Sequence, residues 1–404
     1  LQANTTGFAQ TAVGSGALAT STGSENTAVG YLALNNSAGA TSNTAVGYRS
    51  LDTNTTANNN TSVGHLAMYA NTTGADNTAL GQIALRNNTT GYNNTAVGKS
   101  SLFTNTTGAS NSALGLGALY ANTTGNFNNA LGYNALGANT TGSENTATGS
   151  FALNANTTGS QNTANGYDAL YLNTTGNNNT GLGYYALFSN TTGAGNTAVG
   201  HEALKTNTTG VDNNAFGSQA LEFTTTGGQN TAVGSKALYA NTTGYDNTAV
   251  GNYGLVSNTT GYRNTSFGRS TLALNTTGSF NTAVGRSALF ANTTGANNTS
   301  VGFQSGLANT TGSSNTSLGH NSLISNTTAN FNTAFGRSAL QANITGAENT
   351  ATGYNSQRDT TTGNYNTSNG SGSLAVNTTG SSNVAIGLNA LVANTTASNN
   401  TAVG

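Results

Sequence analysis

The chain of 404 residues contains no cysteine, proline or tryptophan, and only 5% of its residues are charged. The lack of cysteine removes thiol oxidation chemistry altogether, which is compatible with a location outside a cell. The net charge of −1 gives no electrostatic reason to expect binding to a nucleic acid or an anionic membrane, since both need a clustered basic surface. No apolar run approaches the roughly 18 residues of a membrane-spanning helix. We therefore expect no nucleic-acid partner and no membrane insertion.

The residues that are abundant are small or polar. The sequence holds 54 glycines, and most of the remainder is Asn, Thr, Ala, Ser and Leu. So few large apolar side chains cannot build a wide core. Disordered segments are typically rich in Pro, Glu and Lys, which are absent or scarce in this chain. We therefore expect an ordered chain whose order comes from repetition.

A glycine recurs every 17 residues, from Gly30 and Gly47 through Gly387 to Gly404, and only the first interval, from Gly14, is 16 residues long. We number the repeat from this glycine, so its consensus is Gly at position 1, Ala-Leu at 4 and 5, Asn-Thr-Thr-Gly at 8 to 11, and Asn-Thr-Ala-Val at 14 to 17. An unbroken period without insertions is typical of a solenoid. Seventeen residues with two glycines are too short and too rich in Thr and Val for a helical repeat.

We therefore predict an all-β parallel β-solenoid (a β-helix or β-roll) of about 23 coils, spanning residues 1–404 as a single tandem repeat without a globular domain. At ~4.8 Å per coil it would be on the order of 110 Å long. Leu1 and Gly404 both lie in ordinary repeat sequence, without a polar capping repeat. Open solenoid ends associate readily, so we expect this chain to be a segment of a longer chain or an end-to-end polymer.

Within a coil, we predict one strand at positions 14 to 17, as in residues 281–284, and a second at positions 2 to 6, as in residues 286–290. Positions 5 and 17 are apolar in most copies and are the predicted core. Gln357 at position 5 and Asn369 at position 17 depart from this rule, so their coils are the predicted least stable zone. Charged residues occur at positions 2, 3, 6, 7 and 13, which we expect to face solvent.

Positions 4 and 16 carry only small residues, such as Ala152 and Ala147. Two explanations are open. A narrow coil would leave no room for a larger side chain. Alternatively, these positions could pack closely against a second chain, as in a trimer.

The sequence shows no catalytic or metal-binding constellation, and we expect no catalytic residues, no metal, no cofactor and no enzymatic activity. A site of either kind needs ionisable groups that converge within a few ångströms. The only histidines, His65, His201 and His320, share one repeat position but are eight and seven coils apart, which is roughly 34 to 38 Å in a solenoid.

The most regular local motif is Asn-x-Thr at the position-8 turn, which is a potential acceptor of N-linked glycan if the turn is exposed. The alternative is structural: Asn stabilises the turn and stacks in a ladder, and Thr follows because it suits strand edges. If a glycan is present, it could be attached to the Asn or to the adjoining Thr. Twenty of the 24 turns carry the motif. The candidate residues are Asn4, Asn54, Asn71, Asn88, Asn105, Asn122, Asn139, Asn156, Asn173, Asn190, Asn207, Asn241, Asn258, Asn275, Asn292, Asn309, Asn326, Asn343, Asn377 and Asn394.

The motif Asn-Thr-Ala-Val-Gly-Tyr, as at residues 43–48, with a variant at residues 264–272, resembles the head repeats of trimeric autotransporter adhesins and related phage tail-fibre repeats. The resemblance extends over the whole chain. It implies a left-handed parallel β-roll in an extracellular, often trimeric, adhesive or fibrous protein. The 17-residue period and the added Asn-Thr-Thr-Gly turn differ from that family. The dense turn motifs are also similar to those of glycan-coated extracellular microbial fibrils.

These observations favour a structural glycoprotein that forms the core of an extracellular fibril, secreted or at the surface of a bacterial or environmental microbial cell, as in a biofilm matrix. Its expected partners are further copies of itself and covalent glycans, with a trimer as an open alternative. A second hypothesis is a trimeric adhesin or phage tail-fibre shaft that binds a host surface. A minor alternative is an ice-binding solenoid, although Thr293 and Thr294 are adjacent in a turn rather than on a flat face.

Overall fold

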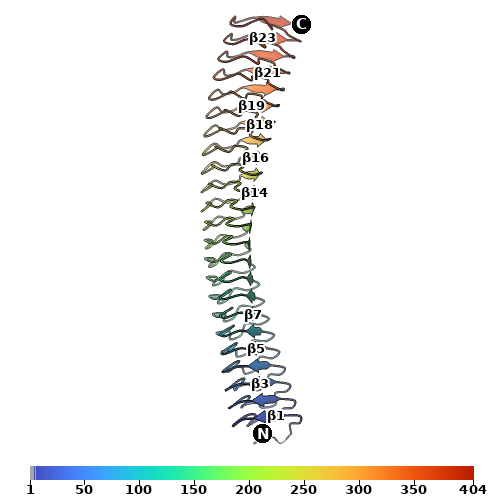
Figure 1. The fold of residues 1–404 in the computed structure, drawn as a ribbon, viewed down its shortest axis with the longest axis vertical. Coiled ribbons are helices and arrows are strands. Elements are labelled where there is room, and N and C mark those ends of the chain that lie inside the picture. The colour runs from blue at the N-terminus through green and yellow to red at the C-terminus, as the bar shows by residue number, and fades with distance from the viewer. Residues whose placement is uncertain (1–3, 5) are drawn as a thin grey trace. The chain divides into compact units, whose positions relative to one another are not determined.

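The computed structural model describes residues 4 and 6–404, so the ordinary repeat sequence expected at Leu1 lies outside the described residues. The fold is a parallel β-solenoid, which confirms the prediction from the repeat (Figure 1). The chain divides into two compact units. The N-terminal unit runs to Val199 and includes Asn207–Thr209, and the C-terminal unit comprises Gly200–Thr206 and Gly210–Gly404.

Each coil contributes one strand of three residues at positions 15 to 17. In the N-terminal unit the strands are β1 (Thr11–Val13), β2 (Thr27–Val29), β3 (Thr44–Val46), β4 (Thr61–Val63), β5 (Thr78–Leu80), β6 (Thr95–Val97), β7 (Ser112–Leu114), β8 (Asn129–Leu131), β9 (Thr146–Thr148), β10 (Thr163–Asn165), β11 (Thr180–Leu182) and β12 (Thr197–Val199). In the C-terminal unit they are β13 (Asn214–Phe216), β14 (Thr231–Val233), β15 (Thr248–Val250), β16 (Thr265–Phe267), β17 (Thr282–Val284), β18 (Thr299–Val301), β19 (Thr316–Leu318), β20 (Thr333–Phe335), β21 (Thr350–Thr352), β22 (Thr367–Asn369), β23 (Val384–Ile386) and β24 (Thr401–Val403).

Within each unit, consecutive strands pair in parallel and in register, so that equivalent repeat positions lie side by side. Thr163 of β10 is opposite Thr146 of β9, and Thr282 of β17 is opposite Thr299 of β18. The turns also bond to neighbouring coils: the Leu136 amide donates to the Ala152 carbonyl at 3.0 Å. Backbone hydrogen bonds between coils therefore continue around the coil and are not confined to the sheet.

The predicted second strand, at positions 2 to 6, is wrong, because these residues form turns. In residues 286–290, Ser287 and Leu289 have φ angles of 57° and 47°. This left-handed conformation is incompatible with an extended strand. Position 1 is Gly in every coil for a related reason. Gly285 has a φ of 120°, and a Cβ there would lie 2.6 Å from the Gly302 carbonyl oxygen of the next coil.

The predicted core is correct at position 5 and wrong at position 17. Leu136, at position 5, is fully buried, whereas Leu131, at position 17 of β8, is 44% exposed. Side chains alternate between the two faces of a strand, and Ala130 at position 16 occupies the interior face. Positions 15 and 17 must therefore point outward. The buried interior consists of Leu at position 5, small residues at positions 4 and 16, and Asn at positions 8 and 14.

This arrangement decides between the two explanations for the small residues. Ala147 and Ala152, at positions 16 and 4, are fully buried inside their own chain. A narrow interior therefore limits their size. Packing of a second chain against these positions, which we considered for a trimer, is excluded, because no other chain can reach them in the folded coil.

The expectation that all charged residues face solvent is also incorrect for three carboxylates. Asp52, Asp168 and Glu222 are 1%, 8% and 5% exposed, respectively. Asp52 is paired with Arg49, whose Nε lies 2.7 Å from its Oδ2. Burial raises the pKa of the Asp168 and Glu222 carboxyl groups above their ordinary values, because desolvation penalises the charged form.

Candidate functional site

The position-8 asparagines form a ladder inside the coil. The Asn88 Nδ2 donates to Asn71 Oδ1 of the preceding coil at 2.8 Å and to the carbonyl of Gly91 in its own turn, also at 2.8 Å. The same pair of bonds recurs at Asn139, with distances of 2.9 Å and 2.9 Å. Each amide therefore closes its own turn and also ties that turn to the coil before it.

The position-14 asparagines form a second buried ladder, which the sequence argument assigned only to the start of a strand. The Asn94 backbone N–H donates to Asn77 Oδ1 at 2.9 Å, and the Asn77 Nδ2 donates to the Gly91 carbonyl at 2.9 Å. Gly91 thus accepts from both ladders. The signal was present in the sequence, because position 14 is Asn in every copy except the first, where it is Gln10.

The predicted glycosylation sites do not have the exposure that an N-linked acceptor needs. Eighteen of the twenty candidate asparagines are buried, and the other two, Asn4 and Asn394 in the first and last turns, are half-buried. A glycan on a buried position-8 amide would replace one of the two Nδ2 hydrogens, so at least one of its two hydrogen bonds would be lost. The expectation of an exposed Asn is therefore wrong, and the structural alternative of a turn-stabilising ladder is confirmed.

The two threonines of the turn have different environments. At position 9, the half-buried Thr89 donates its Oγ1 proton to the Thr106 carbonyl of the next coil at 3.0 Å. At position 10, every described threonine is exposed, as at Thr73, Thr90 and Thr107. Among the described residues from Thr56 onward, no position-10 hydroxyl makes a hydrogen bond within the chain. The accessible part of the motif is therefore the row of position-10 hydroxyls, one on nearly every coil.

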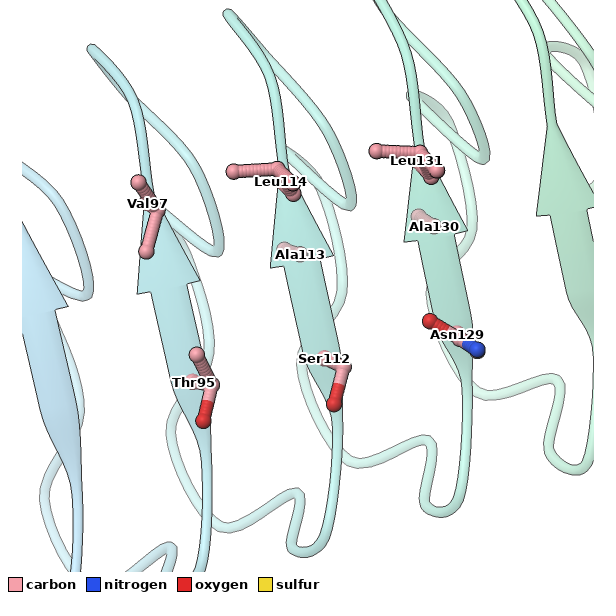
Figure 2. A pocket seen from close by; sticks show the side chains of 8 residues that line it. All are labelled: Thr95, Val97, Ser112, Ala113, Leu114, Asn129, Ala130 and Leu131. Carbon is pink, nitrogen blue, oxygen red and sulfur yellow. The ribbon is translucent and has the colours of Figure 1, made fainter.

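The outer face of the sheet is a second surface with one repeat per coil. Figure 2 shows Thr95, Ser112 and Asn129 at position 15 on one side of this face and Val97, Leu114 and Leu131 at position 17 on the other. Ala113 and Ala130 point to the opposite, interior side. A shallow hollow of about 260 Å³ lies among these side chains.

This face bears on the ice-binding alternative, because the threonines on a β-sheet face are those at position 15, whereas Thr293 and Thr294 lie in a turn. The position-15 threonines do stand on a β-sheet face, as such a protein would require. Position 17 changes, however, from Val to Leu, Phe, Thr, Asn or Ile along the sheet. The face therefore lacks the regular, flat relief on which ice binding depends.

The three histidines are exposed and lie in separate coils. Two of them stack on aromatic neighbours at the same repeat position: the His65 and Tyr48 ring centroids are 5.2 Å apart, and those of His320 and Phe303 are 5.3 Å apart. In residues 4 and 6–404, no group of three or more His, Asp or Glu side chains converges as a metal ligand set would. The same residues contain no helix with the length and hydropathy of a membrane span.

Comparison with known proteins does not place the chain in a family. No protein-family model matches the chain, and no curated protein matches it.

Proposed function

We propose that this chain forms the structural core of an extracellular fibril, secreted or displayed by a microbial cell, and that it carries glycans on its turns. The observation that supports this proposal is that the hydrogen bonds of the solenoid run along its axis, from one coil to the next. Within each unit, backbone bonds and the position-14 ladder join neighbouring coils, and the position-8 ladder does so where both coils carry its Asn. In such a solenoid, the hydrogen-bond donors and acceptors that lack a partner lie in the terminal coils. Further copies can therefore add there and extend a fibril.

The first experiment images the full chain by cryo-electron microscopy after assembly at high protein concentration. We expect filaments whose cross-section holds one solenoid, because the small residues at positions 4 and 16 are enclosed in their own chain. A shaft with three chains in cross-section would contradict this proposal and favour the trimeric adhesin or tail-fibre alternative. Discrete monomers at every concentration would also contradict it.

We place the glycans on the position-10 threonines. From Thr56 onward, their hydroxyls are exposed and unbonded, whereas the Asn amides beside them are buried in the ladder. Neighbouring acceptors would be about one coil spacing, ~4.8 Å, apart. Attached sugars would therefore touch one another and form a hydrated strip along one edge, as suits a matrix fibril.

The test maps glycans on the chain purified from its own organism, by mass spectrometry with fragmentation that preserves the sugar–peptide bond. One turn supplies a matched set: Thr141 at position 10, Thr140 at position 9 with its hydroxyl bonded to the Thr157 carbonyl at 3.0 Å, and the buried Asn139. We expect sugar on Thr141 and none on the other two. Sugar on Asn139, or an unmodified Thr141 in assembled filaments, would refute the assignment.

A further inference from the structure

A row of basic and aromatic residues runs along one edge of the C-terminal unit. Position 2 of six consecutive coils holds exposed side chains of this kind, which we call the basic row: Arg269, Arg286, Phe303, His320, Arg337 and Tyr354. Three of the five neighbouring pairs in the row are in contact. The Arg286 guanidinium lies 5.8 Å from the centroid of the Phe303 ring, Phe303 stacks on His320, and the Arg337 guanidinium lies 5.9 Å from the centroid of the Tyr354 ring.

Among the residues that the structure describes, three of the four arginines outside the basic row are neutralised by a carboxylate, whereas the arginines of the basic row are not. Arg49, Arg263 and Arg358 are paired with acidic residues, at 2.7 Å, 3.3 Å and 2.6 Å. In the part of the chain that the structure describes, Arg269, Arg286 and Arg337 form no ion pair. The sequence explains this, since the 101 residues between Asp246 and Glu348 contain four arginines and no Asp or Glu.

The spacing of these charges is unfavourable for the free protein. Arg269 and Arg286 occupy adjacent coils, about 4.8 Å apart along the axis, where like charges repel. The net charge of the whole chain, −1, conceals this local excess. A bound polyanion that follows the coil axis would relieve the repulsion and contact several guanidinium groups at once.

We propose that the basic row binds an acidic polysaccharide whose chain lies along the coil axis. The planar guanidinium group donates two parallel hydrogen bonds to a carboxylate, so a polymer with a carboxylate on its sugar units matches the arginines. A single-stranded nucleic acid would instead need free ring faces on which its bases stack. In the basic row, Phe303 and His320 cover each other, and Arg286 lies over Phe303.

This inference goes beyond the fibril proposal, and only the choice of a polysaccharide rests partly on that proposal. A fibril in an extracellular matrix would meet acidic polysaccharides there. Binding would then link the fibril laterally to the surrounding matrix, independently of contacts between its ends.

The test measures binding of the full chain to polygalacturonate by isothermal titration calorimetry, with neutral dextran and an oligothymidylate as comparison ligands. The variant Arg269→Gln/Arg286→Gln/Arg337→Gln removes the row charges. The control Arg86→Gln/Lys99→Gln/Lys236→Gln removes three positive charges elsewhere. We expect the row variant to weaken polygalacturonate binding by about tenfold or more, since three charge-assisted contacts are lost, and the control to stay within about twofold. Added salt should weaken binding by the intact chain.

Several results would overturn the inference: no binding of polygalacturonate by the intact chain, equal losses in the two triple variants, equal binding of dextran, or tighter binding of the oligothymidylate. Filament assembly, measured on the same samples, separates this inference from the proposed function. Filaments without polygalacturonate binding would reject the basic row alone. Row-dependent binding by a chain that never assembles would reject the fibril and leave the basic row in place.

Discussion

Two stretches of the chain have the same coil but different interiors. In the N-terminal unit, the coils around Leu119, Leu136 and Leu153 enclose Leu at position 5 and Ala at positions 4 and 16, all of them buried. In the C-terminal unit, between residues 300 and 373, serines take many of the small positions, and Gly306 and Gln357 take the place of Leu. The first interior is apolar and the second is partly a network of hydroxyl groups.

The polar interior satisfies most of its own hydrogen bonds. Ser305 Oγ lies 2.6 Å from Ser317 Oγ and 2.9 Å from Ser322 Oγ, and the Gln357 Nε2 donates to the Thr350 carbonyl at 2.8 Å. The coil survives this replacement because the asparagine and backbone ladders do not depend on the side chains at positions 4, 5 and 16. The apolar interior therefore adds stability to a coil whose path the ladders already define.

The largest expected effect on stability comes from a substitution that disrupts the apolar interior. We expect Leu136→Ala to lower the free energy of unfolding by about 2 to 5 kcal/mol, because it opens a cavity at a fully buried site. The matched control is Leu131→Ala in the preceding strand, where the same change at a 44% exposed position should cost less than about 1 kcal/mol. Urea denaturation of the full chain measures both. Equal costs would contradict the assignment of position 5 to the interior and position 17 to the surface.

The second prediction converts a polar coil into an apolar one. Gln357→Leu should raise the free energy of unfolding by about 1 to 2 kcal/mol, because Gln357 is fully buried and its Oε1 has no hydrogen-bond partner. Gln341→Leu, at the half-buried position 6 of the preceding coil, serves as the control and should change stability by less than about 0.5 kcal/mol. A loss of stability in Gln357→Leu would show that the bonds of the Gln357 amide outweigh its unmet oxygen.

The third prediction repairs a gap in the asparagine ladder of the same coil. Position 8 is Thr360 there, and the Oδ1 of Asn343 and the Oγ1 of Thr360 are buried without partners. Thr360→Asn should restore the ladder and raise the free energy of unfolding by about 1 kcal/mol. Thr362→Asn, at the exposed position 10 of this turn, is the control for the residue type and should have no effect. Hydrogen exchange of the amides of residues 343–377 would locate the gain; unchanged protection there would argue against the ladder as its cause.

The smallest expected effect concerns how the stability of the fold depends on pH. The pKa of Asp168 is raised by burial, so folding favours its protonated form. Below the ordinary pKa of 3.8, the carboxyl is neutral in both states and burial carries no charge penalty; the penalty develops as the pH rises through the raised folded-state value. Asp168→Asn should therefore raise the melting temperature at pH 7, by on the order of 1 °C, and have no effect below pH 3.8. Asn also tolerates the left-handed φ of 54° at this position. The same gain at both pH values would exclude desolvation as the cause.

The predicted least stable zone combines a correct reason with a wrong one. Gln357 does occupy the interior, as the position-5 pattern predicted. Asn369 does not, because position 17 faces outward and this side chain is exposed. The gap in the asparagine ladder at Thr360 is a second reason to expect low stability in this coil. Low stability of this coil stays a prediction, and the variants at Gln357 and Thr360 test it.

The sequence predicted which turn forms the candidate site, but it did not predict which side chain of that turn is accessible. The motif at residues 139–142 identified the turn, and the repeat frame showed that it recurs on nearly every coil. Which side chain is accessible depends on the direction of each Cα–Cβ bond, and Asn139 points inward while Thr141 points outward. Asn and Thr are both polar, so their chemistry alone gave no reason to separate them.

The sequence by itself determined the period, the solenoid fold, the burial of position 5 and the glycine at position 1, because stacked coils require each of these at every repeat. Only the tertiary structure decided which other side chains are buried. Position 17 looks like core because it is apolar, and position 8 looks like surface because it is polar. In this narrow coil the reverse holds, because the interior needs the hydrogen bonds of Asn between coils more than it needs further apolar volume.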